Sequence, residues 1–343
     1  MIMHDNSHRL LLRKAGLVYV NDQEPGITRE RKGRGFCYRM PDGSLLCDTE
    51  IRKRIKTLGL PPAYRDVWIC MLDNGHLQAT GIDARGRKQY RYHTDWHALR
   101  DEKKFHSLAA FGEALPRIRR RARRDAGQTE DGEIATLGAL VLLLDAAHLR
   151  VGNKAYLEEN GTYGATTLLK RHVSFGDMME LHFTAKGGRK VRHRLRSPRL
   201  QKILEHIADL PGRQLFVWKD SDGDVHPVDS GRLNRYLSEL AGEGMSAKTF
   251  RTWGGSLAAF ECAAALLGED TVPSIKALSE ASAMKLLNTP AISRKSYIHP
   301  QILALATEED ARTLLKRQLQ EPVKPPEGLR VSEQRMIAYL EAA

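Results

Sequence analysis

Four short segments in the second half of the chain carry side chains that suit chemistry on a phosphodiester. They supply two arginines, Arg150 and Arg251, one lysine, Lys186, and one tyrosine, Tyr297. A guanidinium group stays protonated at any working pH and can bind two phosphate oxygens, while a lysine can give its proton to a leaving oxygen. A tyrosine hydroxyl can act as the nucleophile. Each position alone is unremarkable, but together these residue types fit a reaction that needs no metal.

Motifs for other common chemistries are missing or incomplete. The sequence Lys186-Gly187-Gly188 lacks the length of a nucleotide-binding P-loop. Asp220–Asp224 matches only the first three ligand positions of a calcium loop, because its glycine comes one residue early and Gly231 stands where the last ligand should be. No acidic cluster of the kind that binds two magnesium ions is visible. We therefore expect no metal and no cofactor.

The charge balance points to a polyanionic partner. The chain has 343 residues, with 54 Lys and Arg against 42 Asp and Glu, which gives a formal net charge of +12. Such an excess favours nucleic acid through Coulomb attraction and counterion release. The longest apolar stretch, around Leu137–Leu144, is too short to span a membrane. No secretory signal and no paired cysteine spacing are visible, so we expect a cytoplasmic, nucleoid-associated protein with reduced thiols.

The ordered motifs also match a known family. Four segments in order match this family: Leu149–Asn153, Phe183–Gly187, Lys248–Gly254 and Asn288–Pro290, with Tyr297 following. In these segments the chain resembles the catalytic core of type IB DNA topoisomerases, and most of all the compact poxvirus-like bacterial branch. The segment Gly86–Tyr92 is similar to the DNA-contacting strand of the N-terminal domain in that branch. Each motif is short, but four in order with matching spacing make the resemblance specific over nearly the whole chain.

The resemblance implies a reaction and a role for each residue. Tyr297 would attack the scissile phosphate and form a 3′-phosphotyrosyl link, leaving a free 5′-hydroxyl. Arg150 and Arg251 would bind the non-bridging oxygens, and Lys186 would protonate the departing 5′ oxygen. Many family members carry histidine where this chain has Asn288. An amide donates a hydrogen bond without carrying charge, so we expect Asn288 to stabilise the transition state only; a helix-terminal cap at Leu287–Pro290 is the alternative interpretation of this residue. The implied activity is relaxation of supercoiled DNA without ATP or metal.

The implied partner is double-stranded DNA. The basic run from Arg117 to Arg124 suits a phosphate backbone, although a solvated helix face explains it equally well, and it cannot specify sequence. Lys248 lies three residues before Arg251, on the same side of a predicted helix. The candidate DNA-binding residues are Gln89, Tyr90, Tyr92, His93, Lys248, Arg117, Arg120, Arg121 and Arg124.

The elements that position these residues suggest two domains. Trp68–Leu72 and His76–Ile82 read as paired strands joined by a tight turn, and Gln89–Tyr92 adds a strand with Tyr90 and Tyr92 on one face. We expect a β-rich DNA-clamp domain at 1–98 and a mainly helical catalytic domain at 99–343. The fold class is α+β: a small antiparallel β-rich N-terminal domain plus a larger, mainly helical catalytic domain with a three-stranded sheet, forming a clamp around DNA as a monomer.

Hydrophobic periodicity and capping residues predict the elements of the larger domain. A buried helix should run from Ile134 to Leu149, with Gly152 as its stop signal. Three strands are predicted at Thr166–Ser174, Met178–Thr184 and Lys190–Arg196. Further helices are predicted at 198–209, 230–240, from 247 onward, and at 272–287, 307–319 and 332–342.

Two other functions stay open at the sequence level. A tyrosine recombinase would use similar residues, but recombinases usually show His-x-x-Arg before the second arginine, whereas this chain has Lys248-x-x-Arg251. A non-catalytic architectural DNA-binding protein would explain the net charge and the basic run without any chemistry. Relaxation of a plasmid by a monomer without paired sites would favour a topoisomerase over a recombinase. Absence of any strand cleavage would favour the architectural protein.

Overall fold

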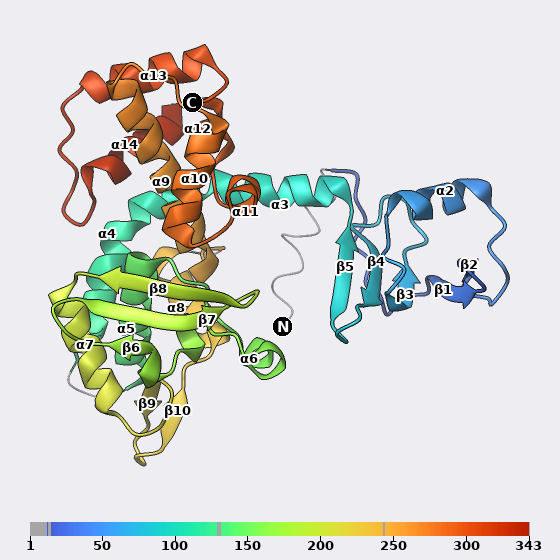
Figure 1. The fold of residues 1–343 in the computed structure, drawn as a ribbon, viewed down its shortest axis with the longest axis horizontal. Coiled ribbons are helices and arrows are strands. Elements are labelled where there is room, and N and C mark those ends of the chain that lie inside the picture. The colour runs from blue at the N-terminus through green and yellow to red at the C-terminus, as the bar shows by residue number, and fades with distance from the viewer. Residues whose placement is uncertain (1–11, 13–14, 129–131, 243, 343) are drawn as a thin grey trace. The chain divides into compact units, whose positions relative to one another are not determined.

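The chain divides into two compact units. The computed structural model describes residues 12, 15–128, 132–242 and 244–342. The units meet in the sequence between Lys104 and Phe105, inside helix α3 (Thr94–His106) (Figure 1). The expected boundary after residue 98 lies within the same helix. No helix among the described residues is long and apolar enough to cross a membrane.

The N-terminal unit is built on an antiparallel sheet, as predicted. Its strands follow the order β2-β1-β3-β4-β5, and the elements are β1 (Ile27–Lys32), β2 (Gly35–Arg39), α2 (Thr49–Thr57), β3 (Arg65–Ile69), β4 (Leu77–Ile82) and β5 (Lys88–Tyr92). Ile27, Ile55, Val67, Ile69 and Ala79 form the core between the sheet and α2. Strands β1 and β2 were not predicted, because their mostly charged and polar residues hide the alternation that marks a half-buried strand.

The larger unit is mainly helical, as predicted, and its core surrounds one long helix. Helix α9 (Ala247–Gly268) contacts α4 (Leu108–Asp125), α5 (Glu133–Ala147) and α10 (Ile275–Leu286). Helix α5 is apolar on all sides and nearly every side chain of its middle turns is buried, as expected for a helix enclosed by the fold. Aromatic rings join α4 to α9, with centroids 5.0 Å apart for Phe111 and Phe250 and 5.9 Å apart for Phe111 and Trp253.

A three-stranded antiparallel sheet of order β6-β7-β8 belongs to this unit. Its strands are β6 (Val173–Ser174), β7 (Met179–Ala185) and β8 (Arg189–Leu195). The last two match the predicted strands, but the first prediction, Thr166–Ser174, is wrong for most of its length. That segment forms the short 3₁₀ turns η1 (Ala165–Thr167) and η2 (Lys170–His172) before the two residues of β6. Its backbone bonds to other loops, for example Leu215 N–H to the Leu168 carbonyl at 2.9 Å, instead of continuing the sheet.

The other elements complete the larger unit. Helices α7, α8, α13 and α14 match predictions, whereas the short elements were not predicted because too few residues carry a periodic pattern. The remaining elements are α6 (Lys154–Asn160), α7 (Pro198–Asp209), β9 (Val217–Lys219), β10 (Val225–Pro227), α8 (Ser230–Ala241), α11 (Pro290–Ser296), α12 (Pro300–Ala304), α13 (Glu309–Gln320) and α14 (Val331–Ala342).

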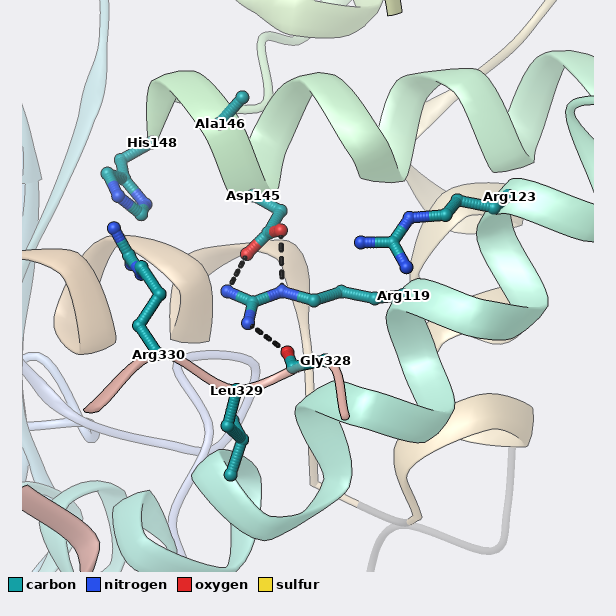
Figure 2. A pocket seen from close by; sticks show the side chains of 8 residues that line it. All are labelled: Arg119, Arg123, Asp145, Ala146, His148, Gly328, Leu329 and Arg330. Atoms are coloured by element: carbon teal, nitrogen blue, oxygen red, sulfur yellow. Dashed lines mark hydrogen bonds and ion pairs between the residues drawn. The ribbon is translucent and has the colours of Figure 1, made fainter. Parts of the chain in front are cut away.

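A buried ion network fixes the last helix, α14, to the core. The Arg119 guanidinium donates to Asp145 through Nε and Nη2 at 2.8 and 2.9 Å, and to Glu333 through both Nη atoms at 2.8 Å. Nη1 also donates to the Gly328 carbonyl at 2.6 Å (Figure 2). All five N–H donors of this arginine are therefore used. Arg330 donates to Glu333 as well, at 2.8 Å, so one carboxylate joins α4 to the segment that leads into α14.

Replacing this carboxylate should destabilise the fold in a pH-dependent way. Burial raises the pKa of Glu333, but Arg119 and Arg330 outweigh it and hold the pKa well below the ordinary 4.5. Its stabilisation is therefore present above pH 4.5 and is lost as the pH falls toward the folded-state value. Glu333→Gln should lower the free energy of unfolding by about 3 kcal/mol at pH 7, and by less at pH 4. Chemical denaturation checks this, with the exposed Glu341→Gln on the same helix as control; equal losses at both pH values would contradict it.

Candidate active site

The main chain at Tyr297 is fixed by helix α9. Tyr297 directly follows α11, and its carbonyl accepts a hydrogen bond from the Ser256 hydroxyl at 3.0 Å. The same hydroxyl oxygen accepts from the His299 backbone N–H at 3.0 Å. A Cβ at Gly255 would lie 2.9 Å from the Tyr297 carbonyl oxygen, so only glycine permits this approach. The Gly255-Ser256 pair thus sets where the tyrosine backbone lies.

Arg251 is buried next to the tyrosine and is held by two helix ends. Its side chain is on α9 and the residue is 4% exposed. Nη1 donates to the His148 carbonyl, and Nη2 donates to the Leu286 carbonyl at 3.2 Å. These carbonyls lie at the C-terminal ends of α5 and α10, where the helix dipole favours a cation. The guanidinium carbon lies 5.1 Å from the centroid of the Tyr297 ring.

Arg150 lies in the irregular segment after α5, and the backbone of this segment is hydrogen-bonded to η1. Helix α5 ends at Ala147, with His148 in the left-handed region at φ 48°. The prediction that this helix continues to Leu149 and stops at Gly152 is therefore wrong. Ala165 N–H donates to the Arg150 carbonyl at 2.8 Å, and a Cβ at Gly152 would lie 3.0 Å from the Cα of Gly164. Gly152 permits this close pairing of loops and does not end the helix.

Asn288 is in contact with Arg150. Nη2 of Arg150 donates to Oδ1 of Asn288 at 3.1 Å. Because arginine only donates hydrogen bonds, this contact assigns the oxygen of the amide to Arg150 and leaves the NH₂ group on the other side. Within the described part of the chain, neither Nδ2 of Asn288 nor Nε of Arg251 has a hydrogen-bond partner, although both atoms are buried. An anion could accept hydrogen bonds from both donors, one on the Arg251 guanidinium and the other on the amide that contacts Arg150.

The charges around the tyrosine favour its phenolate. Burial raises the pKa of Tyr297, but the positive charges of Arg251, Arg150 and Lys248 outweigh it and leave the pKa below its ordinary value of 10.0. Burial in turn lowers the pKa of the Arg251 guanidinium, an effect that its contact with Tyr297 partly offsets. The site therefore brings the predicted nucleophile together with both predicted arginines and Asn288.

The two predicted lysines are both exposed. Lys186 is exposed, in the turn between β7 and β8. Arg189, the first residue of β8 after this turn, donates to the Leu287 carbonyl at 2.6 Å, so the start of β8 is bonded to the residue before Asn288. Lys248 is exposed in the first turn of α9, and its charge reaches the Tyr297 phenol. The role of Lys186 as proton donor stays a prediction.

The candidate DNA contacts of the N-terminal unit lie on and after strand β5. The rings of Tyr90 and Tyr92 stack with centroids 6.1 Å apart and an interplanar angle of 12°, which confirms that they share one face. Tyr90 is 51% exposed. Gln89 donates from Nε2 to Asp83 at 2.9 Å, and Nδ1 of His93 accepts from the Asp95 backbone N–H. Two stacked aromatic rings at an exposed strand suit sugar or base contacts, and their role in binding DNA stays a prediction.

The basic run of α4 is split between solvent and core. Arg117, Arg120, Arg121 and Arg124 are exposed, whereas Arg119 is buried in the ion network. Arg121 and Arg124 also pair with Asp125, at 2.7 and 3.4 Å, and the Tyr236 hydroxyl donates to this buried carboxylate at 2.7 Å. The exposed arginines follow one another on the helix face as a phosphate-binding surface requires, and that role stays a prediction.

Sequence reasoning missed the residues that hold the cluster in place. They are His148, Gly255, Ser256 and Leu287, which act mostly through backbone atoms. A signal exists in Gly254-Gly255-Ser256, because consecutive glycines inside a long apolar helix lower its stability and indicate close packing. The left-handed backbone of His148 and Leu287, at φ 48° and 50°, has no such signal, since bulky residues rarely adopt it.

Comparisons with known proteins agree with this geometry. Residues 93–309 match the family described as eukaryotic DNA topoisomerase I, catalytic core, and residues 35–83 match the bacterial DNA topoisomerase IB N-terminal domain. DNA topoisomerase 1B of Acanthamoeba polyphaga mimivirus is 28% identical over 292 residues, which cover 82% of this chain and 87% of the viral protein. DNA topoisomerase I of Monkeypox virus is 23% identical over 256 residues, covering 72% and 77%.

These matches confirm the family that the motifs indicate and set aside a purely architectural role. The catalytic-core match alone covers more than half of the chain and includes Arg150, Lys186, Arg251, Asn288 and Tyr297. The protein therefore belongs to the type IB family of DNA topoisomerases.

Proposed function

We propose that this protein relaxes supercoiled DNA by cutting and rejoining one strand through Tyr297, without ATP or metal. The observation that carries the proposal is the cluster in which the Tyr297 phenol lies beside Arg251 and Arg150, with two buried donors unpartnered. A scissile phosphate bound there would accept hydrogen bonds from Nε of Arg251 and Nδ2 of Asn288. It would also screen the two guanidinium charges from each other.

The chemical step exchanges one phosphodiester for another. Tyr297 reacts as the phenolate, after its proton has passed to solvent; its oxygen forms a bond to phosphorus as the bond to the 5′ oxygen breaks, and Lys186 gives its proton to that oxygen. Charge that builds up on the non-bridging oxygens is stabilised by preorganised donors, which contribute ~3 kcal/mol each. The phosphotyrosyl link keeps the energy of the broken bond, so the 5′-hydroxyl can attack it and reseal the strand without ATP. Between the two steps the cut strand rotates about its partner.

The two units have separate tasks in this proposal. The larger unit carries the chemistry, and the exposed arginines of α4 with Lys248 bind the phosphate backbone near the cut. The N-terminal sheet contributes Gln89, Tyr90, Tyr92 and His93 to the duplex, so that both units together hold DNA as a clamp. A single chain supplies every residue of the proposed site, which makes a monomer sufficient for activity.

Removing the nucleophile should abolish the covalent adduct and keep DNA binding. Tyr297→Phe retains the ring that contacts Arg251 but has no oxygen to bond phosphorus. We expect no detergent-resistant protein–DNA adduct and no plasmid relaxation in EDTA without ATP, while duplex affinity changes little. The parent chain, tested in parallel, should give both. An adduct that persists in Tyr297→Phe would refute the nucleophile assignment, and relaxation that requires added metal would refute the metal-free mechanism.

Loss of the buried arginine should affect cleavage far more than binding. Arg251→Ala removes a preorganised donor, so single-turnover cleavage should slow by roughly two orders of magnitude. Duplex affinity should fall much less, because many exposed cations supply it. The control is Arg294→Ala, an exposed arginine on α11. A cleavage rate in Arg251→Ala equal to that of the parent, in protein that is shown to be folded, would contradict the proposed role.

The lowered pKa of Tyr297 predicts the pH dependence of cleavage. A phenol with a pKa below 10.0 is more ionised at each lower pH than a free one, so the single-turnover rate should rise with pH and level off below pH 10. Arg150→Gln removes one of the charges that lower this pKa, and the levelling-off should move to higher pH. Rates measured on one duplex at constant ionic strength test this. Profiles of identical shape for both proteins would show that these charges do not control the phenol.

A further inference from the structure

A second cationic pocket lies beside the catalytic segment and takes no part in the proposed chemistry. It has a volume of about 400 Å³ and lies between α4, the C-terminal end of α5 and the segment before α14. Figure 2 shows three arginines around it, Arg119 and Arg123 from α4 and Arg330 from the opposite side, with Arg330 extending toward the His148 ring. Asp145 is the acidic residue of the lining.

The positive charges of this pocket are only partly balanced. Arg119 uses its five donors on Asp145, Glu333 and the Gly328 carbonyl, so it is a structural residue. Arg330 shares Glu333 with it. The half-buried Arg123 guanidinium has no ion pair or side-chain hydrogen bond to any residue that the structure describes. Three guanidinium groups thus face two carboxylates, which leaves a positive excess.

The pKa values of two neighbouring groups are lowered, in part by these charges. Burial lowers the pKa of Lys285, on α10, and the charge of Arg330 lowers it further, while Glu261 and Asp145 oppose the effect. Burial also lowers the pKa of His148 to about 3, assisted by Lys285 and Arg330. The imidazole of His148 is therefore neutral at pH 7. For both groups burial is the larger cause, and the charge of Arg330 acts in the same direction.

His148 adds an unpartnered polar group to the pocket. The residue is 2% exposed, and in the described part of the chain its Nδ1 has no hydrogen-bond partner. A buried polar atom without a partner is costly, and a bound ligand is one way to satisfy it. The backbone carbonyl of the same residue accepts from Arg251, so the pocket and the active site share His148.

We propose that this pocket binds a phosphate group, separate from the one that Tyr297 attacks. Arg123 and Arg330 supply charge-assisted hydrogen bonds, which suit a phosphate because guanidinium groups bind two of its oxygens at once. The phosphate comes either from a free phosphate compound or from the DNA backbone. In both cases an occupant contacts His148, two residues before Arg150, and so lies next to the segment that positions both catalytic arginines.

Binding of inorganic phosphate tests the proposal directly. The assay is isothermal titration at constant ionic strength, in protein that carries Arg150→Gln so that the catalytic anion site contributes little. We expect saturable binding that Arg123→Gln weakens about tenfold or more, as loss of a charged hydrogen bond predicts. Arg317→Gln, at an exposed arginine on α13, should leave it unchanged. Absence of saturable binding, or an equal loss in both variants, would overturn the proposal.

A second measurement identifies the source of the phosphate. Duplex affinity is measured against salt concentration in the Tyr297→Phe protein, with and without Arg123→Gln. If a backbone phosphate occupies the pocket, the variant should bind DNA more weakly and lose about one unit of salt slope. If the natural ligand is a free phosphate compound, affinity and slope should not change while phosphate binding is lost. Either result supports the site, and both measurements use binding alone, so they stand apart from any failure of the cleavage mechanism.

Discussion

The arrangement of the candidate active site depends on the interactions of one buried guanidinium group, that of Arg251. A charge that is 4% exposed needs compensation. The protein supplies it with the carbonyls of His148 and Leu286, at the ends of two helices, and with the nearby phenol. The same contacts bring α5, α9, α10 and α11 together around one point. The charge that the proposed reaction would use is thus also the group that contacts the helices around the candidate site.

The residues that cluster at the candidate site were easier to predict than the geometry that supports them. Arg150, Arg251, Asn288 and Tyr297 are found together, because short motifs in a fixed order retain the residue types that the reaction needs. Three of the five strands of the N-terminal sheet and most long helices were also predicted, since alternation and helical periodicity record which side chains are buried. These features are local in the sequence, and a pattern within a few residues is enough to reveal them.

The failures share a physical cause. Hydrogen bonds between segments far apart in the chain involve each of the features that were missed. These features are the end of α5, the 3₁₀ turns η1 and η2, and the left-handed backbone at Leu287. Thr166 looks like a strand residue, yet its N–H bonds to the carbonyl of Val151 at 2.7 Å. The basic run of α4 gave no hint that Arg119 lies inside and its neighbours outside, because composition shows charge and not direction.

The way Tyr297 is held by its main chain has a consequence for the proposed phosphotyrosyl intermediate. Ser256 holds the residue through its main chain, and the phenol hydroxyl takes no part in that attachment. In the proposed reaction, the side-chain torsions of Tyr297 could therefore change as the bond to phosphorus forms, while the peptide stays in place. In the proposed reaction, strain transmitted from the rotating DNA strand to the tyrosine ring would therefore meet a main chain that α9 already holds in place.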